Sequence, residues 1–271
     1  MQAGVVAAPR VLAPRWASRV ARLRGRGWAL VPVASIIGVI FLIRFASGTA
    51  DWLTYLALVA VPLLCALALG WLMRGARPWL ALLAAGLFVL AWRAPGSLFG
   101  EAAAAVLSGL SCVALGVLLA SVTPRRWLVV GIVAMACADV WLTTTNLLQA
   151  PNNLLTAAAP GGGLPQLQSE QFGGVTMGYG DLFVASLLGG VFAARWPLQW
   201  RAALLTLVCA SLFDLLFLVV DDLPATVPVA VALLLMGLGS RSGRRVGGRV
   251  GRFSGRFGRL RRAGGIPPPA T

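Results

Sequence analysis

The chain contains no histidine and no lysine among its 271 residues, and only 11% of its residues are charged. The lack of histidine excludes zinc proteases built on an HExxH motif and serine hydrolases that use a histidine base. The lack of lysine excludes a serine–lysine dyad. Soluble domains carry about 25% charged residues, so this composition, with 59% hydrophobic residues, predicts a membrane protein.

Eight stretches are apolar and long enough to be membrane spans, since the hydrocarbon core of a bilayer needs about 20 helical residues. The expected spans are 27–44, 51–73, 77–93, 101–122, 127–149, 174–194, 200–220 and 223–240. The predicted fold class is therefore all-α, a polytopic membrane helix bundle. We expect it in a prokaryotic plasma membrane.

The basic residues predict the orientation, because cytoplasmic loops collect positive charge. If both ends are cytoplasmic, all of the 23 basic residues except Arg44 and Arg93 fall on the inner side. The loop 151–173, which has no basic residue, then lies outside. The expected organisation is a basic cytoplasmic arm over 1–26, a four-helix membrane region over 27–122, a second four-helix module over 123–240 and a basic Arg/Gly-rich cytoplasmic tail over 241–271.

Every basic residue is arginine, and the net charge of +15 is concentrated in the arm and the tail. We expect both basic ends to bind the anionic lipids of the inner leaflet, and in the C-terminal tail the arginines recur at helical spacing, as in a helix that lies on the membrane. A glycine-rich tail that only fixes the topology is the open alternative. We expect no nucleic-acid partner, and the sequence does not predict an oligomeric state. The four cysteines fall in separate apolar segments, as expected of small packing residues.

Two aspartates lie within predicted spans, where a carboxylate is costly and therefore indicates function. Asp139 is about ten residues, roughly 15 Å, from the outer end of the fifth span, and Asp181 is about eight residues, roughly 12 Å, below the start of the sixth. The two acids are therefore expected at one level. Such a pair shares a proton, so that one carboxylate activates water while its protonated partner donates to a carbonyl oxygen. This chemistry needs no metal and no organic cofactor.

Three features follow one another along the sequence: Asp139, then Gly178-Tyr179-Gly180-Asp181, then Leu223-Pro224-Ala225-Thr226. This order resembles the presenilin and signal peptide peptidase group of intramembrane aspartyl proteases of the GxGD type, over roughly residues 130–240. The resemblance implies transmembrane peptide substrates, namely single-span segments or signal peptide remnants. It also implies that Asp139 and Asp181 are catalytic, and that Gly178, Tyr179, Gly180, Leu223, Pro224 and Ala225 bind substrate.

The chain departs from that group at three points. Ala138 stands where Tyr is usual, Thr226 stands where Leu is usual, and the predicted spans number eight rather than nine. An inactive relative therefore stays an open interpretation. A second open interpretation is a type IV prepilin-peptidase-like protease, which also uses two aspartates.

The acidic residues and Tyr179 are compatible with several roles. A proton-coupled transporter would use Asp139, Asp181 and Asp214 as a relay, and Asp214 is also a possible accessory to the pair. Asp181 is also suited to capping its own helix. Tyr179 is placed to donate to a catalytic carboxylate or to lie at the headgroup level.

Overall fold

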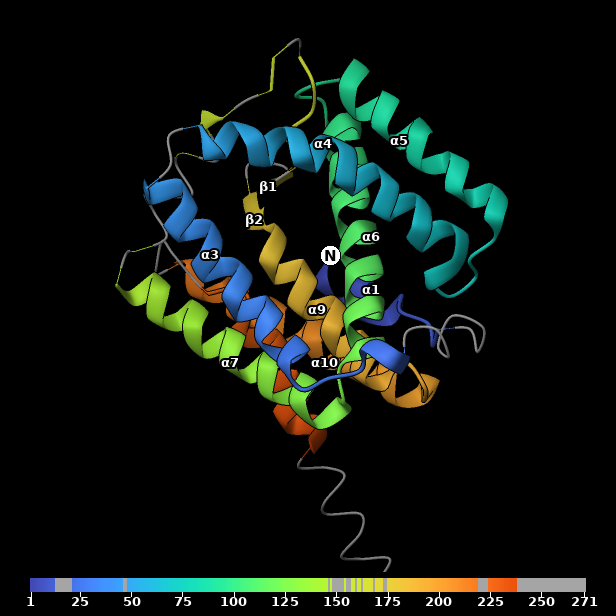
Figure 1. Cartoon of the computed structure of the whole chain (residues 1–271), viewed down its shortest axis with the longest axis vertical. Coiled ribbons are helices and arrows are strands. Elements are labelled where there is room, and N and C mark those ends of the chain that lie inside the picture. The colour runs from blue at the N-terminus through green and yellow to red at the C-terminus, as the bar shows by residue number, and fades with distance from the viewer. Residues whose placement is uncertain are drawn as a thin grey trace, which may run out of the picture. The chain divides into compact units, whose positions relative to one another are not determined.

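The computed structural model in Figure 1 is built almost entirely of helices. The structure describes residues 1–12, 21–45, 48–145, 147, 154, 157–158, 160–161, 163–167, 169–172, 175–218 and 224–237. The chain divides into two compact units, Met1–Ala232 and Leu233–Thr271. The second unit is described only as far as Gly237, so the predicted basic tail 241–271 lies outside the described residues.

Helices form along the apolar runs of the sequence. The long ones are α3 (Val31–Phe45), α4 (Thr49–Leu67), α5 (Leu82–Arg93), α6 (Leu98–Val122), α7 (Arg125–Thr144), α9 (Tyr179–Phe192), α10 (Trp196–Asp214) and a last helix, Val227–Gly237. The short ones are α1 (Gln2–Ala7), η1 (Ala21–Leu23), η2 (Gly27–Leu30), η3 (Ala68–Leu72), η4 (Pro78–Ala81) and η5 (Leu215–Leu218).

Three helical stretches are long and apolar enough to cross a membrane: Asp51–Leu72, Leu98–Val122 and Arg125–Thr144. The prediction of a helical fold is thereby confirmed and three of its helices could span a membrane, whereas the eight spans and the sides of the chain ends stay predictions. Large apolar side chains also point outward, as at Trp52, which is 79% exposed. Uncovered apolar surface of this kind is rare on soluble proteins and suits lipid tails.

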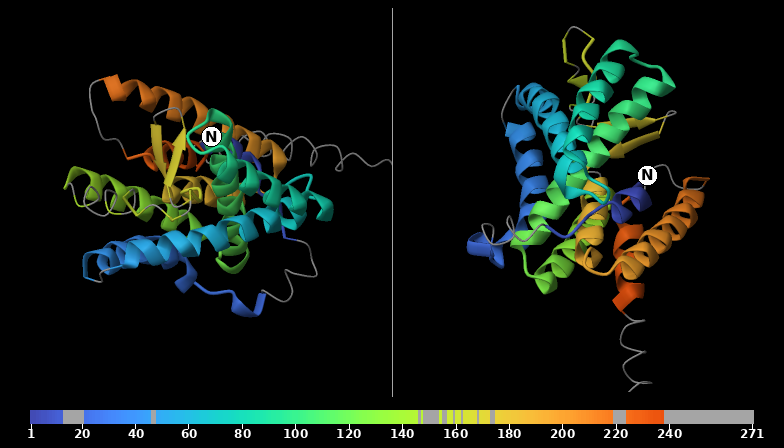
Figure 2. Two further views of the ribbon diagram at one scale, coloured as in Figure 1. Left: turned by 90° about the horizontal axis from the view of Figure 1, so that it is seen from above. Right: turned by 90° about the vertical axis from the view of Figure 1, so that its right-hand side faces the viewer.

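Helix α9 lies at the centre of the bundle, packed against α1, α6, α7 and α10 (Figures 1 and 2). Most of its residues are buried. Its close approach to α6 depends on two glycines: a Cβ at Gly116 would overlap the hydroxyl of Ser186, and one at Gly190 would lie 2.8 Å from the Cβ of Ala120. Small residues at such contacts let membrane helices pack backbone to backbone.

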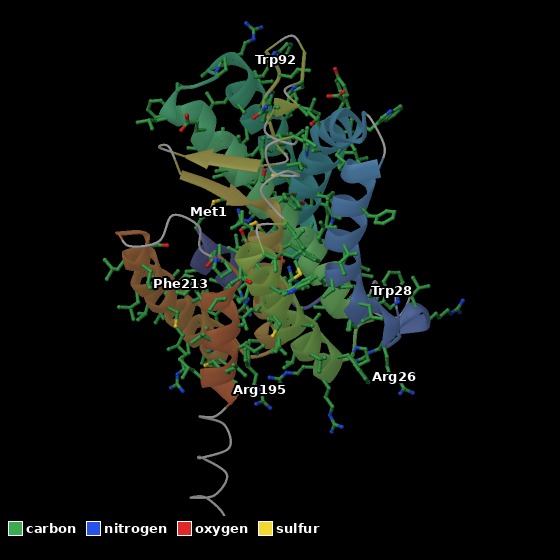
Figure 3. All side chains as sticks on the ribbon, turned by 90° about the vertical axis from the view of Figure 1, so that its left-hand side faces the viewer. Met1, Arg26, Trp28, Trp92, Arg195 and Phe213 are labelled. Atoms are coloured by element: carbon green, nitrogen blue, oxygen red, sulfur yellow. The ribbon has the colours of Figure 1, made fainter. Side chains whose placement is uncertain are left out.

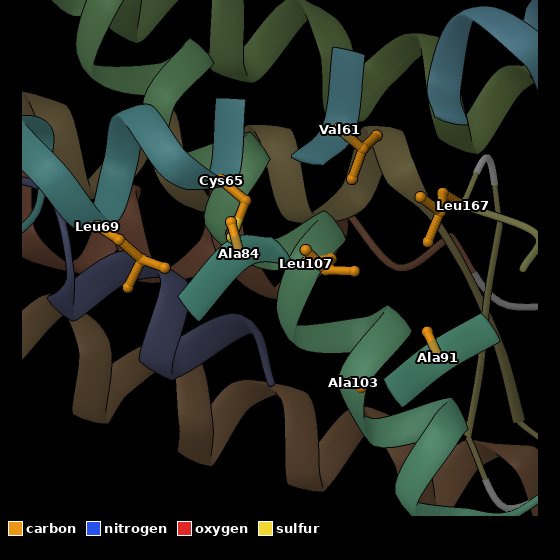
Figure 4. Packing of buried hydrophobic residues seen from close by; sticks show 8 residues of the cluster. All are labelled: Val61, Cys65, Leu69, Ala84, Ala91, Ala103, Leu107 and Leu167. Carbon is orange, nitrogen blue, oxygen red and sulfur yellow. The ribbon is translucent and has the colours of Figure 1, made fainter. Parts of the chain in front are cut away.

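A second packing centre joins α4, α5 and α6 (Figure 4). Its buried members are mostly small or aliphatic: Val61, Cys65, Leu69, Ala84, Ala91, Ala103, Leu107 and Leu167. The expectation that the cysteines are packing residues is confirmed for Cys65 and Cys112, which are buried, whereas Cys137 is exposed.

A short antiparallel hairpin precedes α9, which the sequence reasoning did not predict. Strand β1 (Ser169–Phe172) pairs with β2 (Val175–Gly178), in a register that sets Ser169 opposite Gly178. A Gly-Gly pair separates the two strands in the sequence, and such pairs are typical of two-residue hairpin loops. The expected sixth span therefore begins as a strand, and its helix starts only at Tyr179.

Residues 1–10, the first part of the expected basic arm over 1–26, pack into the bundle, while the extent and side of that arm stay predictions. Helix α1 packs against α9 and α10, and Val6 is fully buried. The buried side chain of Gln199 on α10 holds this segment, because its Nε2 donates to the carbonyl oxygens of Val6 at 3.0 Å and Pro9 at 2.9 Å. The apolar start of the arm, which carries no charged side chain before Arg10, explains why it enters the bundle.

Arg74 completes this polar network from the chain just after α4 and η3. Its guanidinium donates to Oε1 of Gln199 at 2.8 and 3.1 Å and to the carbonyl oxygen of Ala193 at 2.8 Å. It also lies 4.4 Å from the centre of the Trp196 ring. Burial, followed by the nearby charge of Arg10, lowers the pKa of Arg74.

Candidate functional site

The helices α7 and α9 pack against each other, and each contributes one aspartate. Asp139 lies in the second half of α7, and Asp181 is the third residue of α9. Both are half-buried. The two carboxylates are close enough for their charges to interact, so the structure brings together the two acids on which the predicted site depends.

Asp139 is bound by the turn that begins the last helix. Its Oδ2 accepts a hydrogen bond from the hydroxyl of Thr226 at 2.6 Å and one from the backbone N–H of Thr226 at 3.3 Å. A distance of 2.6 Å is typical of a hydroxyl that donates to an ionised carboxylate. Thr226 is only 1% exposed. The motif at 223–226 therefore contacts Asp139 through Thr226. This is the residue at which the motif differs from the presenilin and signal peptide peptidase group.

Asp181 is bound within its own motif. The backbone N–H of Gly178, the N-cap of α9, donates to its Oδ2 at 3.2 Å. A carboxylate in the first turn also interacts favourably with the positive end of the helix dipole. The capping role is therefore part of the structure, although Gly178 and not Asp181 occupies the N-cap position.

The two glycines of the second motif adopt ordinary backbone conformations. Gly178 is extended, with φ −71° and ψ 141°, and Gly180 is helical. A Cβ at Gly178 would lie 3.1 Å from Oδ2 of Asp181. Because Gly178 has no side chain, it leaves room beside the carboxylate of Asp181. Its backbone conformation is one that other residues also adopt, so the greater freedom of glycine is not used here.

Tyr179 links the start of α9 to α6. Its hydroxyl is 2.7 Å from Oγ of Ser111, and its carbonyl oxygen accepts from Sγ of Cys112 at 3.6 Å. Its ring also packs against the cluster between α4, α5 and α6. Tyr179 therefore holds the start of α9 against α6. Since Asp181 is two residues further along α9, this contact also sets the position of Asp181.

Two of the three residues expected around Pro224 are described. Pro224 and Ala225 form the turn before the last helix, and Leu223 lies outside the described residues. The carbonyl oxygen of Ala225 accepts a hydrogen bond at 2.8 Å from Nε2 of Gln2, which is 5% exposed. Sequence reasoning missed Gln2, because nothing in a lone glutamine 223 residues away indicates this contact.

Asp214 is exposed at the end of α10. No hydrogen bond between described residues connects it to Asp139 or Asp181. Within the same part of the chain, no group of three His, Cys, Asp or Glu side chains is placed to hold a metal ion. The chemistry that this arrangement can perform is acid–base chemistry by two carboxylates.

Comparison with known proteins adds no relative: the chain matches no protein-family model, no curated protein and no solved structure.

Proposed function

We propose that this chain is an intramembrane aspartyl endopeptidase of the GxGD type. Its substrates are single-span membrane segments or signal peptide remnants, cut in the outer half of the bilayer. The observation that supports this most directly is the carboxylate of Asp139, bound to Thr226 and within electrostatic range of Asp181 on the adjacent helix. A costly pair of acids in an apolar bundle needs a function to explain it.

The described hydrogen bonds all reach one oxygen of each carboxylate. Thr226 and Gly178 both donate to an Oδ2 atom. Among the described residues, neither Oδ1 atom accepts a hydrogen bond. In the proposed site, the two Oδ1 atoms contact the water and the substrate carbonyl group.

In the proposed reaction, the ionised aspartate accepts a proton from water while the water oxygen attacks the carbonyl carbon. The protonated partner donates its proton to the carbonyl oxygen, which gives a neutral diol. The C–N bond then breaks as the first aspartate returns its proton to the amine nitrogen. One diol hydroxyl gives its proton back to the second aspartate, and the pair is restored without a covalent intermediate.

The test uses single-span reporter peptides in lipid vesicles, with the products identified by mass spectrometry. We expect two fragments from the wild type, cut within the apolar segment. Asp139→Asn and Asp181→Asn keep the side-chain shapes and should lower turnover by roughly 10³-fold or more. The matched control is Asp214→Asn, which removes an exposed carboxylate from the same half of the chain and should retain activity.

A folded wild type that cleaves none of the reporters would overturn the proposal. If that protein instead carried protons or a solute across the vesicle membrane, the result would select the transporter. Cleavage that persists in the Asp139→Asn variant would also contradict the proposal, because it would show that the two aspartates do not act as a catalytic pair. The lipid and the temperature are held the same for every variant.

A further inference from the structure

The first unit contains an apolar cavity of about 340 Å³ at the end where η2 leads into α3. Its lining includes Leu115, Leu118 and Leu119 from α6, Phe183 from α9, Val31 from α3 and Trp28 from η2. This volume lies within the range of ligand sites, which starts at about 300 Å³. The cavity is partly open to the surroundings, so a ligand can enter from outside the bundle.

The cavity offers its occupant no free hydrogen-bond donor among its described polar side chains. The hydroxyl of Ser121 donates to the carbonyl oxygen of Leu118 at 2.6 Å. The indole N–H of Trp28 donates to the carbonyl oxygen of Leu23 at 2.7 Å. Since a buried polar group of a ligand would stay unpaired here, the chemistry that fits is a hydrocarbon chain.

Positive charge lies beside one side of this cavity. The backbone N–H of Gly25 donates to the carbonyl oxygen of Val122 at 3.0 Å, which fixes the segment with Arg24 and Arg26 beside the end of α6. Both arginines are exposed. Figure 3 shows Arg26 next to Trp28 at the same end of the molecule as Arg195, opposite to Trp92.

These arginines have no acidic neighbour in the sequence. The stretches 21–31 and 115–128 contain arginines and no aspartate or glutamate, and the same is true of 183–201. These stretches therefore offer no carboxylate that would compete with an anion from outside the chain. An interfacial tryptophan beside an arginine cluster is typical of the headgroup level of a membrane.

We propose that this cavity binds one anionic phospholipid of the inner leaflet. Its acyl chain fills the space between α3, α6 and α9, and its phosphate pairs with Arg24 and Arg26. The lipid would hold η1 and η2 against the end of α6 and support α9 at Phe183. This site is distinct from the diffuse attraction expected of the C-terminal tail, and it does not depend on the proposed protease activity.

The test measures binding of dioleoyl phosphatidylglycerol and dioleoyl phosphatidylcholine to the full chain in detergent, by native mass spectrometry. We expect the wild type to bind one phosphatidylglycerol more tightly than phosphatidylcholine. The double variant Arg24→Gln, Arg26→Gln should lose about 30-fold in affinity for phosphatidylglycerol, since each arginine near the headgroups is worth about fivefold. Its affinity for phosphatidylcholine, in which the choline cation offsets the charge of the phosphate, should fall much less.

Two further variants separate the parts of the site. Leu118→Trp fills the cavity and should weaken both lipids. The control Arg195→Gln, Arg201→Gln removes two exposed arginines from the start of α10 and should lower the affinity for phosphatidylglycerol much less than the Arg24 and Arg26 variant does. The tail is unchanged in all forms, so its contribution cancels. An equal loss in the Arg195 control would show diffuse charge attraction only, and a folded Leu118→Trp variant that binds like wild type would show that the cavity holds no chain; either result overturns the proposal.

Discussion

The hydrogen bond between Thr226 and Asp139 gives the sharpest test of how the site is positioned. Thr226→Val removes the hydroxyl that donates at 2.6 Å and keeps nearly the same volume at a position 1% exposed. The backbone N–H of residue 226 remains 3.3 Å from Oδ2, so Asp139 keeps one donor. The fold is therefore expected to survive.

The magnitude follows from the type of bond that is lost. A hydrogen bond to a charged group contributes about 1.5 to 3 kcal/mol, which corresponds to about 10- to 150-fold in rate if the whole of it acts in the transition state. We expect kcat for reporter cleavage to fall in that range with little change in KM, because Thr226 acts through Asp139 and not on bound substrate. Thr226→Ser keeps the hydroxyl and should restore most of kcat.

The two variants at position 226 separate the hydroxyl from the methyl group. Thr226 stands where the resembling group usually has leucine, which has no hydroxyl to donate. Wild-type kcat in Thr226→Val would refute the positioning role. An equal loss in Thr226→Ser and Thr226→Val, with both folded, would mean that the methyl group and not the hydroxyl matters.

The stability of the bundle, measured as thermal unfolding in detergent, depends on a few tight contacts. Gly116→Ala should destabilise strongly because its Cβ would overlap a serine hydroxyl on α9, whereas Gly86→Ala, with nothing within 4 Å of the added Cβ, should be neutral or slightly stabilising. Gln199→Leu removes two donors and one acceptor from a buried network and should cost about 2 to 4 kcal/mol; an unfolding temperature equal to wild type would contradict that network. Gln2→Leu leaves the Ala225 carbonyl oxygen without its donor and should lower the free energy of unfolding by about 1 to 3 kcal/mol. An unchanged free energy of unfolding would show that α1 packs elsewhere in solution.

The helical character of the chain and its helices that could span a membrane were predictable, because hydrophobicity over about 20 residues is a local property. The runs that contain α6 and α7 needed no long-range information. The same holds for the two aspartates, since an acid in an apolar run is visible in the sequence, and consecutive helices tend to be neighbours. The structure places both acids on helices that pack together.

What the sequence did not reveal depends on contacts between distant residues. Thr226 and Asp139 are 87 positions apart, and Gln2 and Ala225 are 223 apart. No local pattern specifies which hydroxyl or amide reaches which oxygen across a bundle. The hairpin before α9 was missed for a different reason: Val175 and Thr176 extend an apolar run, and short apolar runs do not distinguish strand from helix.

The measurement that tests the central claim most directly is the turnover of one cleavable reporter by wild type, Asp139→Asn, Asp181→Asn and the double variant, in the same lipid. Groups that act as one catalytic unit are strongly non-additive. The account predicts that each single variant falls to the same background as the double variant, while Asp214→Asn stays near wild type. Substantial turnover in either single variant, with a further loss in the double, would mean that the two aspartates do not act as a pair.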